Sequence, residues 1–387
     1  GGSPAGSRTG YDFGGWQNPD GSPANFTTPV TGNLVLSASW TMRHYTVTVL
    51  DAPDADPGHQ NQIITQDTNA VHGSTPTEPA RPDNKTNYVF DHWAKPDGST
   101  YNFDEPLSGD LTVHAVYRQK RYTVRYDSGT PHSVGSMTDS HFGGGDTNPL
   151  PPNQYARPGF TFGGWSRTPG GTTPDYADGQ PVTNLTTSDG VTVTLYAVWN
   201  PASPAVLHDP PVKKVITGAV PHNAGNFTFL LRAVSTTAPE AAGVLPMPLA
   251  AGGSQEMQLV IAGAGEEEFG DITFRLPGTY VYEISELPIG RRGFSFDPDP
   301  VTVTYVVTQS GSVLNATRTI EKRGQAVTEA VFTNEFEKPN YIVTFNGNGA
   351  WRPFESQSVR EGLTATEPTR KPVRSYGKFI GWYLDGQ

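Results

Sequence analysis

Short runs in which apolar and polar residues alternate recur along the chain. Residues 45–49 read Tyr-Thr-Val-Thr-Val, and residues 111–117 read Leu-Thr-Val-His-Ala-Val-Tyr. A period of two is typical of strands with one buried face. Runs with a helical period are few, and none is long. The pattern therefore predicts a mainly β protein with room for only short helices between its strands.

A larger pattern repeats several times. It consists of an aromatic-x-Phe-x-x-Trp segment followed, some distance on, by a short aliphatic strand that ends in Ala-x-Trp or Ala-x-Tyr. Copies begin at Tyr11, Tyr88 and Phe160, and a truncated copy lies at residues 377–382. Each copy of such a repeat forms one small structural unit, and successive units stack along the chain. The sequence therefore predicts an array of domains that acts as a stalk or spacer. Only residues 118–121 separate two of the units, which predicts a stiff junction.

The repeat is interrupted between Trp165 and Trp382 by sequence of another kind. Proline-containing segments at residues 201–205 and 337–340 mark its two edges. Many short strand-like runs with turn signals between them indicate a β-sandwich. The predicted strands are residues 212–216, 227–233, 256–261, 280–286, 301–308 and 330–336.

These patterns predict a mainly β, multidomain protein with tandem small repeats and one immunoglobulin-like sandwich. Because the first and last units are incomplete, we expect a monomeric segment of a longer protein. The predicted domains are a partial repeat (1–43), two complete repeats (44–118 and 119–200), the sandwich (206–337) and a last partial repeat (340–387).

Composition narrows the range of functions. The 43 Gly and 35 Pro residues are accompanied by 35% hydrophobic and 11% aromatic residues, so we expect folded cores and not disorder. A net charge of -11 makes nucleic acids and anionic membranes poor partners. The chain has no Cys, which excludes disulfides and Cys-based metal or catalytic sites. We expect no cofactor, no metal site and no membrane contact in this segment.

The repeats resemble the internalin B-type repeat, also called the Listeria–Bacteroides repeat. The match rests on Tyr-Thr-Val strands, Phe-x-Gly-Trp segments and Leu-x-Ala-x-Trp strands, and it covers residues 11–199 and 341–387. The resemblance implies small β-grasp-like modules strung along a bacterial surface protein, hence an extracellular location on the cell wall with an anchor outside this segment. The tryptophans are expected to pack in the cores of the modules, since aromatic side chains of this kind are usually buried.

In the inserted domain, three predicted strands each aim one polar side chain at an apolar face. Side chains alternate along a strand. Lys214 therefore shares a face with Val212 and Ile216, and Glu286 shares one with Tyr282 and Ile284. Asn334 lies between Phe332 and Phe336 on its own face. Burying three unpaired polar groups would cost several kcal/mol, and burying them in contact with one another removes most of that cost.

The same residues resemble the motifs of the pilin isopeptide-linkage domain of Gram-positive surface proteins. Those motifs are Lys-x-x-x-Gly, Tyr-x-x-x-Glu and Phe-x-Asn, in that order, and they match Lys214 with Gly218, Tyr282 with Glu286, and Phe332 with Asn334. The resemblance covers about residues 206–337. It implies a spontaneous amide bond between the side chains of Lys214 and Asn334, assisted by Glu286. Because this reaction would happen once per molecule and without turnover, we expect the protein not to be an enzyme.

Burial makes this chemistry reasonable. A desolvated lysine gives up its proton more easily, and the neutral amine is a nucleophile. The same surroundings would keep Glu286 protonated, so that it can donate a hydrogen bond to the carboxamide oxygen of Asn334. Ammonia then leaves.

Two residues compete with this assignment. Lys213 alternates with Val215, so parity alone does not choose between the two lysines, and the spacing to Gly218 selects Lys214. Glu283 is the second candidate acid, although it falls on the face opposite Tyr282. The alternative interpretation is a surface lysine, an edge glutamate and a turn-forming asparagine with no bond between them.

Three functions are compatible with the sequence. The first is a structural stalk with one self-crosslinked sandwich, and the second is an adhesive module that binds a host protein or glycan. A glycosidase with paired carboxylates ranks last, because small tandem units offer no large cleft. The acidic cluster at Asp51, Asp54 and Asp56 lacks the spacing of a calcium loop and is interpreted as a solvated turn.

Overall fold

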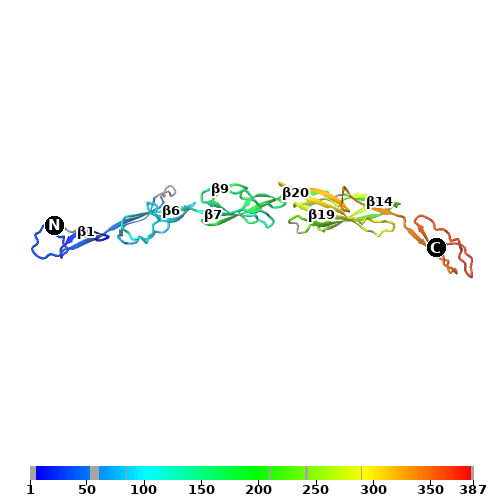
Figure 1. The fold of residues 1–387 in the computed structure, drawn as a ribbon, viewed down its shortest axis with the longest axis horizontal. Helices are drawn as coiled ribbons and strands as arrows, with labels where there is room; N and C mark the ends of the chain where they lie inside the picture. Colours follow the sequence, from blue (N-terminus) through cyan, green and yellow to red (C-terminus); the bar gives the residue numbers. More distant parts are fainter. Residues whose placement is uncertain are drawn as a thin grey trace. The chain divides into compact units, whose positions relative to one another are not determined.

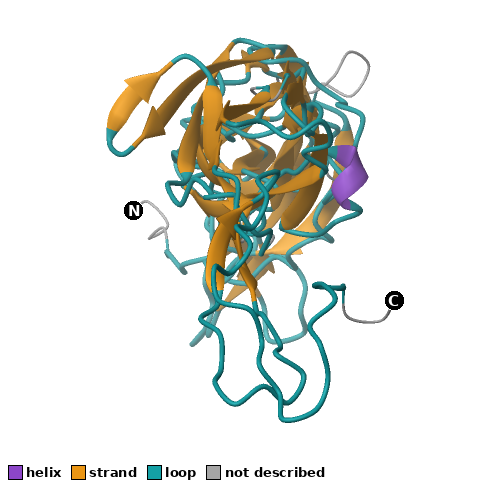
Figure 2. Ribbon diagram, turned by 90° about the vertical axis from the view of Figure 1, so that its right-hand side faces the viewer, coloured by secondary structure: helices purple, strands orange, loops and turns teal. Residues whose placement is uncertain are grey.

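The protein is built almost entirely from strands and loops (Figure 1 and Figure 2). The computed structural model describes residues 6–52, 61–83, 85–208, 211–239, 243–288 and 290–384. Within these residues the only helix is one turn of 3-10 helix, η1 (Leu249–Ala251). The predicted mainly β fold class is confirmed. Loops and short strands occupy the places where the repeats could have held short helices.

The N-terminal part begins with a hairpin and continues with a four-stranded sheet. The hairpin pairs β1 (Tyr11–Gln17) with β2 (Ser37–Met42). The sheet has the order β4-β3-β6-β5, in which the central pair is parallel and the outer pairs are antiparallel. Its strands are β3 (His44–Leu50), β4 (Ile63–Val71), β5 (Tyr88–Ala94) and β6 (Leu111–Gln119).

The next repeat has the same plan, with the order β10-β12-β7-β8 and a parallel pair between β7 and β12. The same repeat also contains a small two-stranded antiparallel sheet, in which β9 pairs with β11. The strands are β7 (Arg121–Asp127), β8 (Ser140–Gly143), β9 (Thr147–Pro149), β10 (Phe160–Ser166), β11 (Pro181–Thr183) and β12 (Thr192–Pro201).

The tryptophans of the Phe-x-x-Trp segments in the two complete repeats lie in their cores, as predicted, whereas Trp199 is only partly buried. Trp93 is buried together with Val113 and Ala115, and its ring meets that of Phe103 edge-on at 6.1 Å. Trp165 is fully buried, with the ring of Tyr126 at 5.1 Å. The Phe-x-x-Trp strand therefore recurs because each small module needs one large aromatic side chain to fill its interior.

Residues 205–336 form a sandwich of two main sheets (Figure 1). The larger sheet is antiparallel and has the order β16-β15-β19-β20-β21-β22. Its strands are β15 (Asn226–Thr236), β16 (Glu256–Ala262), β19 (Gly278–Leu287), β20 (Val301–Ser310), β21 (Val313–Lys322) and β22 (Gln325–Val327).

The smaller sheet, β17-β14-β23, joins the first long strand of the domain to the last in a parallel pair. A further pair links β13 to β18. The strands are β13 (Ala205–Leu207), β14 (Val212–Gly218), β17 (Gly265–Glu267), β18 (Ile272–Phe274) and β23 (Ala330–Phe336).

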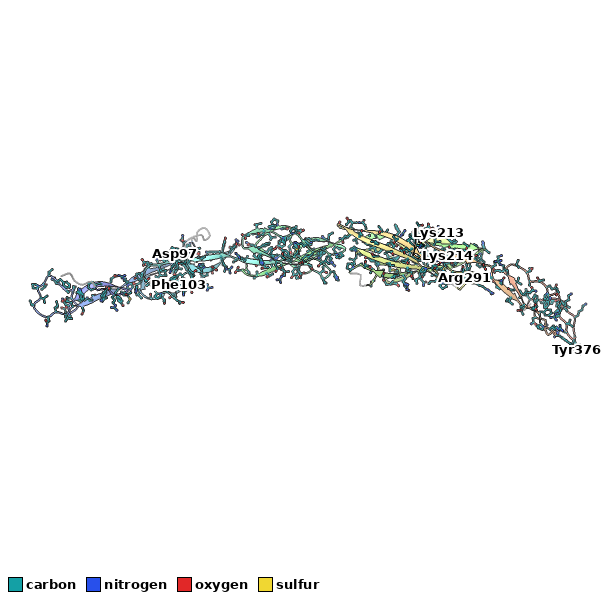
Figure 3. All side chains as sticks on the ribbon, in the orientation of Figure 1. Asp97, Phe103, Lys213, Lys214, Arg291 and Tyr376 are labelled. Carbon is teal, nitrogen blue, oxygen red and sulfur yellow. The ribbon has the colours of Figure 1, made fainter. Side chains whose placement is uncertain are left out.

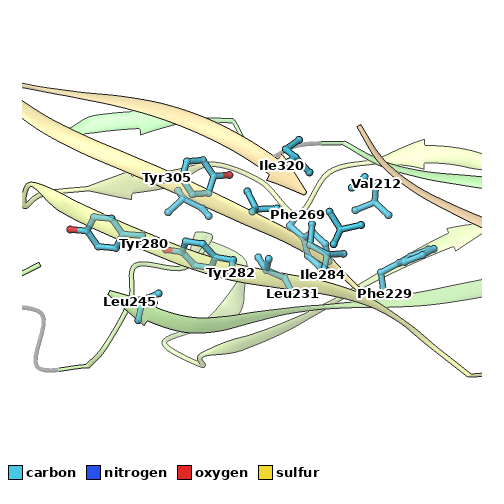
Figure 4. Close-up of a cluster of buried hydrophobic side chains, with 14 of the residues drawn as sticks. Val212, Phe229, Leu231, Leu245, Phe269, Tyr280, Tyr282, Ile284, Tyr305 and Ile320 are labelled. Atoms are coloured by element: carbon cyan, nitrogen blue, oxygen red, sulfur yellow. The ribbon is translucent and has the colours of Figure 1, made fainter. Parts of the chain in front are cut away.

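Apolar side chains from both sheets fill the interior of the sandwich (Figure 4). Tyr280, Tyr282 and Ile284 alternate inward along β19, and Phe332 of β23 faces the ring of Phe229 at 5.2 Å. All six strands that the sequence predicted for this domain are confirmed.

The C-terminal segment contains the hairpin β24 (Asn340–Val343) and β25 (Gln357–Arg360). The truncated repeat at residues 377–382 does not form a strand, contrary to the repeat pattern. Trp382 instead contacts the rings of Phe345, Phe354 and Phe379 at 5.1–5.4 Å.

Candidate functional site

The parallel pair of β14 and β23 positions two of the three motif residues. Lys214 lies opposite Phe332, and Ile216 lies opposite Asn334. Strand β14 ends at Gly218, whose φ is +83°, and a Cβ there would approach the carbonyl oxygen of Phe336 to 2.4 Å. Only glycine fits this close approach, which explains why the lysine motif ends in Gly.

Lys214 points into the sandwich and meets Glu286 there. Its Nζ lies 2.9 Å from each carboxylate oxygen of Glu286, and both side chains are 0% exposed. The ring centroid of Phe227 lies 4.7 Å from the same nitrogen. The amine is thus enclosed by one acid and by aromatic carbon, as the alternation along the strand predicted.

Glu286 comes from β19 in the opposite sheet, on the inward face that it shares with Tyr282. The hydroxyl of Tyr282 donates to the carbonyl oxygen of Pro246 at 2.5 Å. This bond satisfies the only polar side-chain atom of a fully buried tyrosine, so that its ring can pack in the core on the same face of β19 as Glu286, four residues away. The Tyr-x-x-x-Glu motif therefore combines a core residue with the acid of the site.

Asn334 is fully buried, and the two ends of its carboxamide have different partners. Its Nδ2 donates to Oε1 of Glu286 at 2.7 Å, and its Oδ1 accepts from the backbone N–H of Asp297 at 3.1 Å. The sequence predicts a hydrogen bond from Glu286 to this oxygen. The structure reverses this, because a backbone N–H can only donate and so must face Oδ1.

Burial makes the Lys214 amine more acidic. Desolvation lowers the pKa of Lys214 below its ordinary value of 10.5, and this outweighs the hydrogen bond and charge of Glu286, which act in the other direction. The amine therefore loses its proton more easily than an exposed lysine does. That is the direction needed for a nucleophile.

The two competing residues lie outside this cluster. Lys213, the neighbour of Lys214 on β14 (Figure 3), pairs with Glu329 at 3.1 Å and its side chain is 41% exposed. Glu283 pairs with Arg232 at 2.9 Å and is 31% exposed. The structure thus brings together Lys214, Glu286 and Asn334, and it leaves the alternative lysine and acid at the surface.

Sequence reasoning missed two polar residues beside the cluster. Asp297 lies in the loop before β20, and its carboxylate accepts from Nζ of Lys322 at 2.7 Å. Lys322 ends β21, a strand that the sequence did not predict. Burial alone would raise the pKa of Asp297, but hydrogen bonds from Lys322 and from the N–H groups of Thr333 and Asp299 lower it.

The acidic cluster at Asp51, Asp54 and Asp56, in the repeat at residues 44–118, is not solvated at every position. Asp51 is buried and accepts from Nζ of Lys85 at 2.8 Å and from the hydroxyl of Tyr117 at 3.0 Å. The interpretation of Asp51 as solvated was therefore wrong, whereas Asp54 and Asp56 lie outside the described residues. Tyr117 replaces the usual Trp of the repeat, and its hydroxyl is used for this bond.

Other kinds of site find no support in the part of the chain that the structure describes. No group of three His, Asp or Glu side chains there is arranged to hold a metal ion. None of its helical segments has the length and hydropathy of a membrane span.

Two sequence families match the chain. The Listeria-Bacteroides repeat domain matches residues 2–39, 54–116, 122–198 and 341–387, and the Spy0128-like isopeptide containing domain matches residues 210–337. A protein of Evansella cellulosilytica, described provisionally as a Gly-rich membrane protein, is 30% identical over 142 residues. That match covers 36% of this chain and only 15% of the relative's length.

Among solved structures, the major pilin of Streptococcus pyogenes is 18% identical, with a TM-score of 0.26 over 45% of this chain and 70% of the pilin. The T-13 major pilin of the same species is 15% identical, with a TM-score of 0.25 over 39% of this chain and 60% of the pilin. The repeat family accounts for more than half of the residues. The chain therefore belongs to the Listeria-Bacteroides repeat family and carries a Spy0128-like isopeptide containing domain between its repeats.

Proposed function

We propose that this chain is a structural stalk segment of a bacterial cell-surface protein, located outside the cell. Its sandwich domain forms an intramolecular amide bond between Lys214 and Asn334. One observation carries the proposal: Nζ of Lys214 and Nδ2 of Asn334 both lie within 2.9 Å of the same oxygen, Oε1 of Glu286, inside a closed core.

The reaction balances without a co-reactant. In the reactive state the amine of Lys214 is neutral and Glu286 carries the proton. Nζ attacks Cγ of Asn334, and the C–Nδ2 bond then breaks. Glu286 takes a proton from Nζ and gives one to Nδ2, because it contacts both nitrogens, and ammonia leaves. The products are one secondary amide and one ammonia, and Glu286 ends as it began.

The bond would join the first and last long strands of the domain. By analogy with a disulfide that closes a loop of this length, it would stabilise the folded domain by roughly 4–5 kcal/mol through its effect on the unfolded chain. It would also carry tension directly from β14 to β23. A covalent link of this kind suits a spacer that must resist pulling and proteolysis.

An adhesive function through the repeat tryptophans has less support. Trp93 and Trp165 are buried, so neither ring is available to stack on a glycan. The open groove beside Lys95, Tyr101 and Glu105 has a volume of about 520 Å³, and the amine of Lys95 is already paired with Glu105. We therefore favour the structural role.

Intact mass spectrometry tests the bond. The folded protein should weigh less than its sequence mass by one ammonia, and a proteolytic digest should contain one branched peptide that includes residues 214 and 334. Lys214→Ala, Glu286→Ala and Asn334→Ala should each restore the full mass. Lys213→Ala is the matched control and should keep the loss. A wild-type protein with the full sequence mass would refute the crosslink.

A further inference from the structure

The loop before β20 contributes to the proposed crosslink site, although no motif includes it. We propose that the backbone N–H of Asp297 stabilises the negative charge that develops on Oδ1 of Asn334 during amide formation, and that the side chains of Asp297 and Lys322 hold this N–H in place. The inference rests on the proposed crosslink and assigns a further catalytic group to it.

The chemistry requires a donor at this oxygen. When Nζ of Lys214 bonds to Cγ of Asn334, the electron pair of the C=O double bond moves onto Oδ1. The charge returns to re-form C=O only when the C–Nδ2 bond breaks. Hydrogen-bond donors about 2.7–3.1 Å from such an oxygen lower the barrier strongly in a water-excluded site. The N–H of Asp297 already donates to Oδ1 at 3.1 Å in the unreacted carboxamide, and Oε2 of Glu286 is its second, more distant acceptor at 3.4 Å.

Glu286 cannot fill this role, because it faces the other end of the carboxamide. Its Oε1 accepts from Nδ2, and its two oxygens also hold the amine of Lys214. The site thus separates its tasks. Glu286 moves protons between the two nitrogens, while Asp297 faces the oxygen.

The side chain of Asp297 fixes the position of its own backbone. Its carboxylate accepts from the N–H of Thr333 at 3.0 Å, directly beside Asn334 in β23, and from the amine of Lys322 at 2.7 Å. Lys322 also donates to the carbonyl oxygen of Val331 at 2.7 Å. The carboxylate therefore takes the place of a strand carbonyl along β23 and keeps the loop in register with Asn334.

The rest of the loop is held in the same way. The N–H of Ser295 donates to the carbonyl oxygen of Glu335 at 2.9 Å, and the N–H of Glu335 donates to the hydroxyl of Ser295 at 2.9 Å. Prolines at 298 and 300 fix the backbone φ angles on the other side of Asp297. Because the donor is preorganised, little rearrangement is needed when the charge develops.

The partly buried charges of this ion pair are balanced. The side chains of Asp297 and Lys322 are 11% and 18% exposed, so the carboxylate would oppose a developing negative charge nearby if it stood alone. The ammonium of Lys322 cancels it at 2.7 Å. Lys322 therefore has two tasks, to orient the carboxylate and to neutralise it.

The rate of amide formation tests the inference. Unreacted chain is recovered from inclusion bodies in denaturant, refolded by dilution, and sampled by intact mass, with protease resistance of the sandwich reporting folding in the same samples. Asp297→Ala and Lys322→Met should slow ammonia loss in the folded fraction by up to about a hundredfold, as expected when a reacting group is misplaced. Asp297→Pro, which lacks the N–H, should slow it by about a hundredfold to a thousandfold.

Two further variants separate positioning from general stability. Asp297→Asn keeps an oxygen that can accept from Thr333 and should recover much of the rate lost in Asp297→Ala. Asp299→Asn is the matched control from the same loop. The carboxylate of Asp299 pairs with Arg323, away from the three reacting side chains, and its removal should leave the rate unchanged.

The outcomes distinguish this inference from the crosslink itself. If the wild type never loses ammonia, the proposed function fails and this inference fails with it. If the wild type reacts, and folded Asp297→Ala and Lys322→Met react at the wild-type rate, the crosslink stands and the role of Asp297 is overturned. If Asp297→Pro does not fold, the other two variants decide the question.

Discussion

Lys214 and Asn334 lie on neighbouring parallel strands, two register positions apart, on the face that points into the sandwich. A diagonal pair of this kind is within reach of a long side chain. Since β14 is the first long strand of the domain and β23 the last, a bond at this point would leave residues 215–333 outside the path of a force applied at the two ends.

The first prediction is mechanical. When a single molecule is pulled from its ends, the wild-type sandwich should not release residues 215–333, because the proposed amide bond would carry the load. Lys214→Ala should release them, adding roughly 400 Å at about 3.3–3.6 Å per extended residue. Optical or magnetic tweezers would measure the difference. Lys213→Ala, which alters only the exposed pair with Glu329, should behave as the wild type does. Equal extensions for Lys214→Ala and wild type would contradict the load-bearing role.

The second prediction concerns pH. The pair formed by Lys214 and Glu286 must hold one proton to react, with the amine neutral and the acid protonated. Burial lowers the pKa of Lys214 below 10.5, opposed by Glu286 and Asp297 and assisted by the charge of Lys322. The pair should therefore lose its last proton at a pH below 10.5, and amide formation should slow above that point.

Refolding of unreacted chain at a series of pH values, followed by intact mass, gives this profile. Glu286→Gln keeps the shape of the side chain but cannot shuttle a proton, so its slow reaction should depend only on the neutral amine and should accelerate as the pH rises. A wild-type rate that also rises steadily to pH 10.5 would show that Glu286 moves no proton.

The three residues of the proposed bond could be named from the sequence for two different reasons. Alternation along a strand determines which side chains share a face, and it placed Lys214, Glu286 and Asn334 each on an apolar face but left Lys213 equally possible. The resemblance to the isopeptide-linkage motifs, through the spacing from Lys214 to Gly218, then selected Lys214. The strands themselves were predictable where one face is strongly apolar. Strand β21 was missed because most of its side chains are polar and exposed, and β4 for the same reason.

The contribution of Asp297 could not be predicted from the sequence. Its backbone N–H reaches Asn334 only because the preceding loop runs along the free edge of β23, and a loop path leaves no periodic signal. The orientation of the Asn334 carboxamide depends on that same N–H. The burial of Asp51 was likewise hidden, because its partners Lys85 and Tyr117 are distant in sequence.

The third prediction concerns this buried aspartate of the second repeat. Asp51→Ala would leave the amine of Lys85 and the hydroxyl of Tyr117 without their acceptor, which should destabilise the repeat by about 1–3 kcal/mol. Differential scanning calorimetry would detect a lower melting temperature for its transition. Asp104→Ala, at an exposed aspartate of the same repeat, should change stability by less than about 0.5 kcal/mol. If both variants melt alike, the Asp51 contacts contribute nothing.

Asp51 should also make the stability of this repeat depend on pH at the acidic end. Burial acts to raise the pKa of Asp51, but hydrogen bonds from Lys85, the N–H of Ala52 and Tyr117 lower it below 3.8. A carboxyl whose pKa is depressed on folding contributes stability above its ordinary pKa, and that contribution is lost as the pH falls through the folded value. The Asp51→Ala variant should therefore show less loss of stability between neutral pH and pH 3 than the wild type.

The last prediction concerns the short junction at residues 118–121. Arg118 makes two hydrogen bonds to Asp189, at 3.1 and 2.6 Å, and the N–H of Arg121 donates to the same carboxylate at 2.9 Å. The amine of Lys120 donates to the carbonyl oxygens of Thr86 and Thr187 at 3.0 Å. Hydrogen bonds from Arg118 and Arg121 lower the pKa of Asp189 to about 2, so these contacts persist at any ordinary assay pH.

Trypsin is a direct probe of this junction, because Arg118, Lys120 and Arg121 are all cleavage sites. The contacts should keep the wild-type junction closed to the protease. Asp189→Ala removes the acceptor of the hydrogen bonds from Arg118 and Arg121 and should make cleavage severalfold faster, if cleavage follows local opening. Asp139→Ala removes a comparable pair with Arg125 elsewhere in the same repeat and should leave cleavage at residues 118–121 unchanged. Equal cleavage of wild type and Asp189→Ala would mean that these contacts do not stiffen the junction, and any stiffness would then have to come from its shortness alone.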